Sequence, residues 1–96
     1  MKFVALFSQK QANDQATMAE AMGRRADYQF PTGMRLIDEY WSASTNPSVV
    51  AIYEADDPAA LTINSITWLD MFDVQVFPVT TYEEGLDKLT RHLAGE

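Results

Sequence analysis

Three short segments are hydrophobic at both odd and even positions, and this pattern restricts the fold more than any other feature of the chain. Alternate residues of a β-strand point to opposite faces of a sheet, so a strand with one solvated side alternates between apolar and polar residues. The segments are residues 3–7 (FVALF), 49–52 (VVAI) and 74–79 (VQVFPV). We therefore expect a sheet that is covered on both faces.

Four stretches are predicted to be strands because they are rich in β-branched and aromatic residues. Residues 3–7 are too short for a core helix, and residues 34–43 follow the turn sequence FPTG. Residues 44–47 (STNP) form a tight polar link to residues 49–55, which is typical of a hairpin. Residues 73–79 supply the fourth strand.

Helical periodicity predicts one helix after the first strand and another near the end of the chain. Asn13 or Asp14 can cap the first helix. The last helix begins at a capping box, in which the side chains of Thr81 and Glu84 each bond the other residue's amide. The expected core positions are Met18, Met22 and Ala26 in the first helix and Tyr82, Leu86, Leu89 and Leu93 in the last.

The segment after residue 56 admits two interpretations. Asp57 is a good capping residue and Pro58 fits the first helical turn, so the pair predicts a helix. The β-branched run in residues 62–67 favours a strand instead, but such propensities differ by only about a few tenths of a kcal/mol. We therefore expect a helix. Its predicted core stripe is Leu61, Ser65, Trp68, Leu69 and Phe72.

The order β-α-β-β-α-β followed by a helix predicts one domain over residues 1–96, of the α+β class and the ferredoxin-like type. In that fold the helices cover one face of a four-stranded antiparallel sheet. The other face is apolar here, and no residues remain to cover it. A second copy of the same sheet is the economical cover, because a two-fold interface is self-complementary. We therefore expect a homodimer.

Composition excludes several classes of partner and site. The formal net charge is −7, which opposes binding to nucleic acids or to anionic membranes. The absence of cysteine excludes disulfides, thiolate metal sites and cysteine nucleophiles. We expect no cofactor and no metal site. No segment approaches the roughly 20 apolar residues of a membrane span, so a soluble, cytoplasmic protein is expected.

Four segments resemble a family of short prokaryotic proteins that is known only as a domain of unknown function. They are residues 38–41 (DEYW), 51–61 (AIYEADDPAAL), 68–72 (WLDMF) and 77–79 (FPV). The layout is similar to that of the dimeric α/β-barrel superfamily, in which two ferredoxin-like sheets pair into a barrel. That superfamily includes cofactor-free monooxygenases, lactone isomerases and heme enzymes, so the resemblance implies a dimeric α/β barrel but no particular reaction. Relatives often carry a histidine where this chain has Ser42, which argues against proton transfer there.

Glu39, Trp41 and Tyr53 are the first candidates for binding a ligand. Strict alternation along the second strand places Glu39 and Trp41 on one face, together with Arg35 and Ile37. An acid beside an indole offers a polar anchor and a flat apolar wall. Tyr53 could join them in an aromatic pocket, although ordinary core packing explains it equally well.

Glu54 is the fourth candidate, because it shares a strand face with apolar residues. Such a carboxylate could have a raised pKa and act as a general base, although an ion pair with Arg35 or a place at the rim is favoured. His92 is the only histidine and lies in the last turn of the final predicted helix. A surface or capping role is favoured for it, since an imidazolium is stabilised at a helix C-terminus.

Two functions fit these observations. The first is a small homodimeric binding or interaction module without cofactor, whose partners are a second copy of the chain and a small hydrophobic ligand. The alternative is a cofactor-independent enzyme, similar to the monooxygenases or isomerases of the barrel superfamily, which acts on a small hydrophobic compound. A closed pocket that contains a buried carboxylate would favour the enzyme, and a filled core would favour the binding module.

Overall fold

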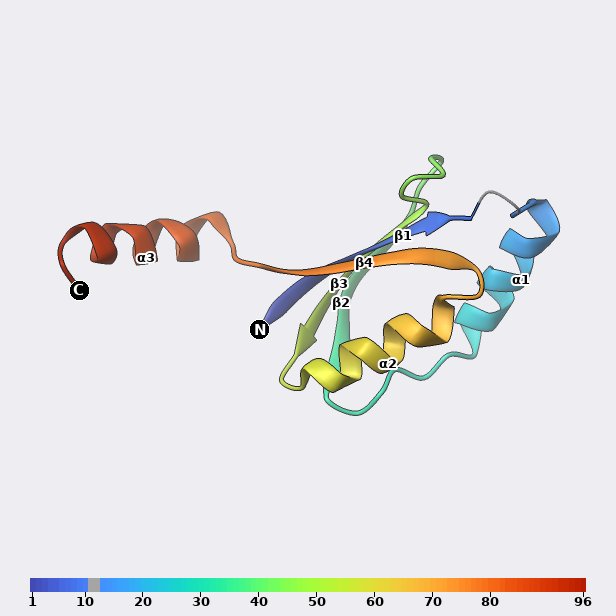
Figure 1. Cartoon of the computed structure of the whole chain (residues 1–96), viewed down its shortest axis with the longest axis horizontal. Helices are drawn as coiled ribbons and strands as arrows, with labels where there is room; N and C mark the ends of the chain where they lie inside the picture. Colours follow the sequence, from blue (N-terminus) through green and yellow to red (C-terminus); the bar gives the residue numbers. More distant parts are fainter. Residues whose placement is uncertain (11–12) are drawn as a thin grey trace.

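A computed structural model describes residues 1–10 and 13–96 of the chain (Figure 1). The element order is βαββαβ with a C-terminal helix, as the sequence predicts. The elements are β1 (Lys2–Gln9), α1 (Gln15–Ala26), β2 (Met34–Trp41), β3 (Val49–Ala55), α2 (Pro58–Trp68), β4 (Phe72–Val79) and α3 (Tyr82–Leu93).

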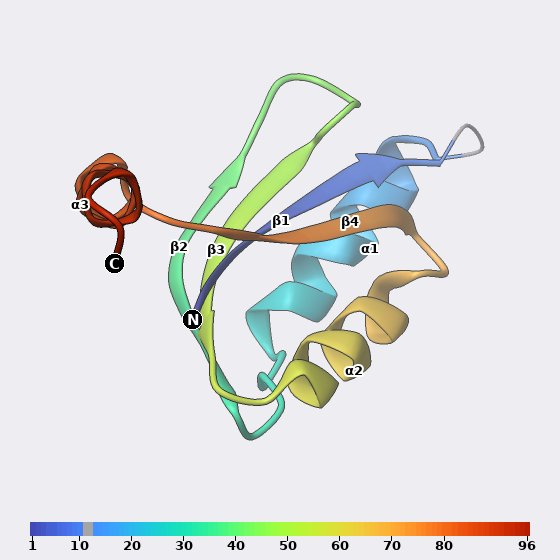
Figure 2. The ribbon, with the colours of Figure 1, turned by 60° about the vertical axis from the view of Figure 1, so that its left-hand side comes forward.

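The four strands form one antiparallel sheet in the order β2-β3-β1-β4. Helices α1 and α2 lie side by side against the same face of this sheet (Figure 2). The ferredoxin-like α+β fold expected from the sequence is therefore confirmed. The face that carries α1 and α2 is called the helix face below, and the opposite one the open face.

Each helix begins at a side-chain cap that the sequence predicts. The Asp14 carboxylate accepts a hydrogen bond from the Thr17 amide at 2.8 Å. Asp57 does the same for the Ala59 amide at 2.9 Å, so the segment after it is a helix rather than a strand. At α3 the Thr81 hydroxyl accepts from the Glu84 amide at 3.1 Å. The described residues show no return bond from the Thr81 amide to the Glu84 carboxylate, so only one of the two predicted bonds of the capping box forms.

The core lies between the helix face and the two helices. Trp68 at the end of α2 and Phe72 at the start of β4 pack together, with ring centroids 6.2 Å apart. Phe7 of β1 meets Phe72 edge to face at 5.8 Å. Small residues such as Ala5 and Ala51 are fully buried in the sheet, which lets the helices approach it closely.

Several expected core positions of the helices are wrong. Met22 and Ala26 are exposed, because α1 faces the sheet through the small residue Ala21. In α2, Leu69 is exposed because it lies at the C-cap, where the last turn leaves the sheet. The buried stripe of α2 is Ala60, Leu61, Asn64 and Trp68, while Ser65 is half-buried and Phe72 belongs to β4.

A β-bulge in β2 corrects the alternation expected along this strand. The pairing with β3 shifts between Leu36 and Asp38, so Ile37 is an extra residue. Beyond the bulge, Glu39 and Trp41 point to the helix face as Leu36 does before it. The expectation that Arg35 and Ile37 share a face with Glu39 is therefore wrong. The second strand also ends at Trp41, two residues earlier than expected.

Helix α3 extends away from the rest of the molecule (Figure 1). It has no buried residue, and its four apolar side chains on one face are 48–77% exposed. They share a face as expected, but their expected place in the core of the single chain is wrong, because α3 does not pack on the sheet. The radius of gyration is 15.9 Å, whereas a compact domain of this length has about 12.5 Å. No helix within residues 1–10 and 13–96 is long and apolar enough to cross a membrane.

Candidate functional site

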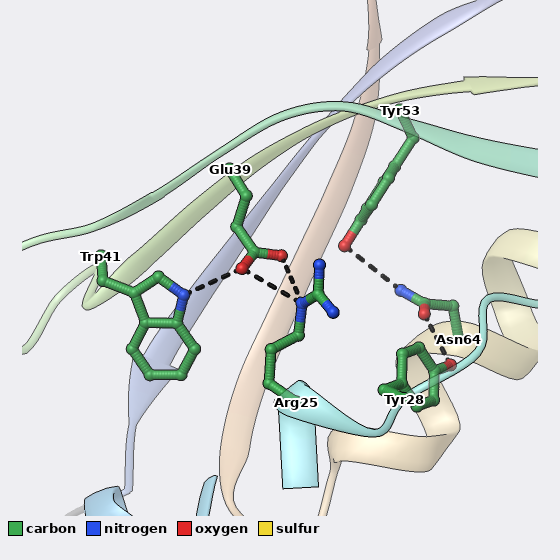
Figure 3. Close-up of polar contacts among 6 residues, drawn as sticks. All are labelled: Arg25, Tyr28, Glu39, Trp41, Tyr53 and Asn64. Atoms are coloured by element: carbon green, nitrogen blue, oxygen red, sulfur yellow. Dashed lines mark hydrogen bonds and ion pairs between the residues drawn. The ribbon is translucent and has the colours of Figure 1, made fainter. Parts of the chain in front are cut away.

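A small hollow lies on the helix face, between the end of β2, the end of α1 and the middle of β3. Figure 3 shows three of the predicted site residues there, with Glu39 and Trp41 coming from β2 and Tyr53 from β3. The bulge at Ile37 brings Glu39 and Trp41 to this face, as described above. The residues lining the hollow are Phe7, Arg25, Tyr28, Phe30, Glu39, Trp41, Val49, Tyr53, Trp68 and Phe72.

The Glu39 carboxylate is the polar centre of the hollow. It accepts hydrogen bonds from Arg25 Nε, at 2.9 Å to Oε1 and 3.1 Å to Oε2. It also accepts one from Trp41 Nε1 at 2.9 Å. The side chains of Arg25 and Glu39 are only 27% and 16% exposed. A charge that is largely withdrawn from water needs a partner of opposite sign, and each side chain supplies this to the other.

Arg25 also lines the hollow, although the sequence did not indicate it as a candidate. It comes from the last turn of α1, where basic side chains are favoured by the helix dipole. Its guanidinium also stacks over the Phe30 ring, with Cζ 5.0 Å from the ring centroid. The neighbouring Arg24 points elsewhere and forms a two-point ion pair with Asp70. The pair of arginines at a helix end was the available signal, but it does not say which one meets Glu39.

Tyr53 belongs to a buried polar chain that the sequence did not indicate. The Tyr28 hydroxyl donates to Asn64 Oδ1 at 2.7 Å, and Asn64 Nδ2 donates to the Tyr53 hydroxyl at 3.5 Å. Burial raises the pKa of Tyr53 to about 12, so the phenol stays protonated at neutral pH. Asn64 lies on the α2 stripe between Leu61 and Trp68. A polar residue amid that stripe was the only signal for this contact.

The hollow is small. Its volume is about 20 Å³, and a single water molecule requires roughly 10–15 Å³ measured in the same way. It is therefore neither a large closed pocket nor a completely filled core. Its walls are mainly aromatic, and its polar atoms come from Arg25, Glu39 and the two tyrosines.

Glu54 lies away from the hollow. It points to the open face, where its carboxylate pairs with the amino group of Met1 at 2.6 Å. That hydrogen bond lowers the pKa of Glu54, and the positive charges of the amino group, Arg35 and Lys2 lower it further. The alternative of a raised pKa, which the sequence made the less favoured one, is therefore wrong. Arg35 faces Glu54 across the β2–β3 pair, so the predicted electrostatic partner does contribute.

A comparison with protein families gives a decisive match. The model of a domain of unknown function, DUF3303, matches residues 1–93. The chain belongs to the DUF3303 family. This confirms the resemblance to an uncharacterised domain family. No curated protein and no solved structure matches the chain.

Because the DUF3303 family has no assigned function, chemical possibilities have to come from the geometry. Three or more His, Cys, Asp or Glu side chains that could hold a metal do not gather anywhere in the described part of the chain. Asp38 and Glu39 point to opposite faces, as expected for neighbours on a strand. The Glu39 lone pairs are engaged by Arg25 and Trp41. The hollow therefore offers hydrogen-bond donors and aromatic surface rather than a free carboxylate base.

Proposed function

We propose that this DUF3303 protein is a homodimeric binding module, which assembles through the open face of its sheet and holds a small ligand with an apolar body at the Glu39–Trp41 hollow. The observation that carries the proposal is the uncovered apolar surface. Helices α1 and α2 cover only the helix face, and α3 lies beside the sheet rather than on it (Figure 2).

The centre of the open face is a continuous apolar surface. Val4 of β1 lies between two cross-strand neighbours, Ile52 of β3 and Phe77 of β4. Leu6 and Val50 extend this surface along the same strand pair. Charged side chains lie around it, namely Lys2, Arg35, Asp38, Glu54 and Asp73. An apolar centre with a polar rim is the usual arrangement of a protein interface.

A second copy of the chain suits this surface. Two sheets pack face to face with their inner side chains interdigitated, at a distance of about 10 Å. A two-fold arrangement brings the same apolar centre of each copy against the other, which satisfies both at once. The β2 edge contributes Tyr40, which is exposed on the open face beside the apolar centre.

Helix α3 supports association with a second copy. A single helix of 12 residues is marginal in water, because isolated helices shorter than about 12–15 residues are barely stable. Its apolar side chains therefore need a cover that the rest of this chain does not provide in the described structure.

The areas of the open face and of the apolar side of α3 are consistent with an interface that uses both surfaces. Four strands of about eight residues have a projected area of roughly 500 Å², while a stable interface buries about 800 Å² per partner. One face of a 12-residue helix adds about 180 Å². If α3 of each copy packs on the other copy, three surfaces of each copy are buried: the open face, the apolar side of its own α3, and the area that the other α3 covers. Their projected area is about 850 Å² per copy.

Light scattering tests the assembly directly. At micromolar concentration we expect one species with twice the chain mass. A monodisperse monomer would contradict the proposal, and its apolar surface should then bind a hydrophobic dye such as ANS. Higher oligomers that lack a discrete dimer would also contradict it, because a two-fold interface closes at two copies.

A further inference from the structure

We infer that the hollow is a binding site for a carboxylate, which accepts hydrogen bonds from the guanidinium end of Arg25 and the hydroxyl of Tyr53. The inference rests on the ligand-binding part of the proposed function and specifies its ligand class. It requires no residue of a second copy.

Arg25 brings donors that the protein leaves free. Its Nε is occupied by Glu39, as described above. Neither Nη1 nor Nη2 has an acceptor among residues 1–10 and 13–96. Figure 3 shows these two nitrogens on the side of the guanidinium toward Tyr53 and Asn64. The Glu39 bond thus fixes the guanidinium plane and leaves the N–H groups of Nη1 and Nη2 able to donate to a ligand.

Tyr53 adds a second donor to the same space. It is 2% exposed, and its oxygen accepts only the long contact from Asn64. Its own O–H has no acceptor within the part of the chain that the structure describes. Asn64 presents its Nδ2 to Tyr53, and its Oδ1 accepts the 2.7 Å bond from the Tyr28 hydroxyl. The Tyr53 O–H is therefore able to donate to an oxygen that enters the hollow.

The acceptor that best fits this donor set is a carboxylate. Two terminal N–H groups of a planar guanidinium match the two oxygens of a carboxylate, and a charged acceptor strengthens each bond. The volume of about 20 Å³ exceeds what one water needs but does not hold a whole organic molecule. The carboxylate group would enter, and the body of the ligand would lie outward against the partly exposed rings of Trp41 and Phe30.

Glu39 has a positioning role in this site. Its negative charge offsets that of Arg25, so charge attraction alone does not hold the ligand. Binding therefore depends on the geometry of the hydrogen bonds. This selects a planar anion with two coplanar oxygens over a spherical anion such as chloride, and the aromatic walls select an apolar body.

Titration of the full chain with sodium benzoate tests the inference. Both tryptophans of the chain, Trp41 and Trp68, line the hollow, so their fluorescence reports binding there. We expect saturable binding of benzoate to the wild type. Binding should be about ten- to a hundredfold weaker in Arg25→Lys, because lysine keeps the charge but lacks the two coplanar N–H groups. Tyr53→Phe keeps the ring, loses only the hydroxyl and should also weaken binding. Circular dichroism checks that each variant is folded.

Arg91→Lys is the matched control, because Arg91 is paired with Asp87 on α3, outside the hollow, and should not affect benzoate. Benzamide, which has the same ring without the charge, should bind more weakly than benzoate. Absence of saturable benzoate binding, or equal affinity in the wild type and both hollow variants, would overturn the inference. If toluene shifts the tryptophan fluorescence while benzoate does not, the carboxylate is wrong and the proposed apolar-ligand site stands. If neither binds, both fail.

Discussion

Replacing Phe77 with lysine should dissociate the proposed dimer while leaving each copy folded. Phe77 lies on the open face opposite Val4 and is 38% exposed in the single chain. Lysine keeps a long apolar stem, which can still lie over Val4, but adds a charge that a sheet-to-sheet interface cannot hydrate. The perturbation therefore acts on the interface more than on the fold.

The expected magnitude follows from the exposed area of Phe77. Aromatic side chains bury about 150–250 Å² each, so the exposed 38% corresponds to about 75 Å². At about 25 cal/mol per Å², burying this area stabilises the interface by roughly 2 kcal/mol. Two-fold symmetry doubles the effect to about 4 kcal/mol, which is about a thousandfold in the dimer Kd. The cost of burying the new charge adds to this.

Sedimentation velocity over a dilution series measures the Kd of the wild type and of Phe77→Lys. Ile63→Lys is the matched control, because Ile63 is 55% exposed on the outer side of α2, away from the open face. Circular dichroism should show similar secondary structure in all three proteins. A Phe77→Lys dimer as tight as that of the control would refute the open-face interface.

Two further predictions concern the helices. Leu89→Glu on α3, where Leu89 is 52% exposed, should weaken the dimer while circular dichroism shows the same secondary structure, and an unchanged Kd would exclude α3 from the interface. Asp57→Ala removes the cap of α2 and should lower stability by about 1 kcal/mol, or Tm by about 4–8 °C. The mass in light scattering should stay the same, and an unchanged Tm in differential scanning calorimetry would show that the Asp57–Ala59 bond does not stabilise α2.

The fold was predictable because independent local signals agreed. Strands with apolar residues at both parities and three side-chain caps, one of which is followed by Pro58, all indicate the same element order. The helix after Pro58 was the hardest case, since its β-branched residues favour a strand. The cap and the apolar spacing prevailed, and the exposed positions Ile63 and Ile66 show that β-branched residues tolerate a solvated helix face.

The candidate site was predictable only in part. Glu39, Trp41 and Tyr53 do line one hollow, but the argument for their shared face assumed strict alternation. A bulge adds one residue without any marker in the sequence here, so it changed the neighbours of Glu39. Arg25 comes from a helix, and its contact with Glu39 depends on how that helix packs on the sheet. Whether these residues bind a ligand stays a prediction.

Strand β2 connects the two parts of the proposed function. Within residues 1–10 and 13–96 it is an edge strand that pairs with β3 alone, so its outer side receives no support from the sheet. Tyr40 points to the open face, and its sequence neighbours Glu39 and Trp41 point into the hollow. A second copy that packs against Tyr40 would hold this strand in place and so fix the carboxylate that orients Arg25. Linkage is reciprocal: the factor by which dimerisation raises the affinity for a ligand at Glu39 and Trp41 is also the factor by which that ligand raises the affinity of the dimer. The interface and the hollow should therefore be coupled through this one strand.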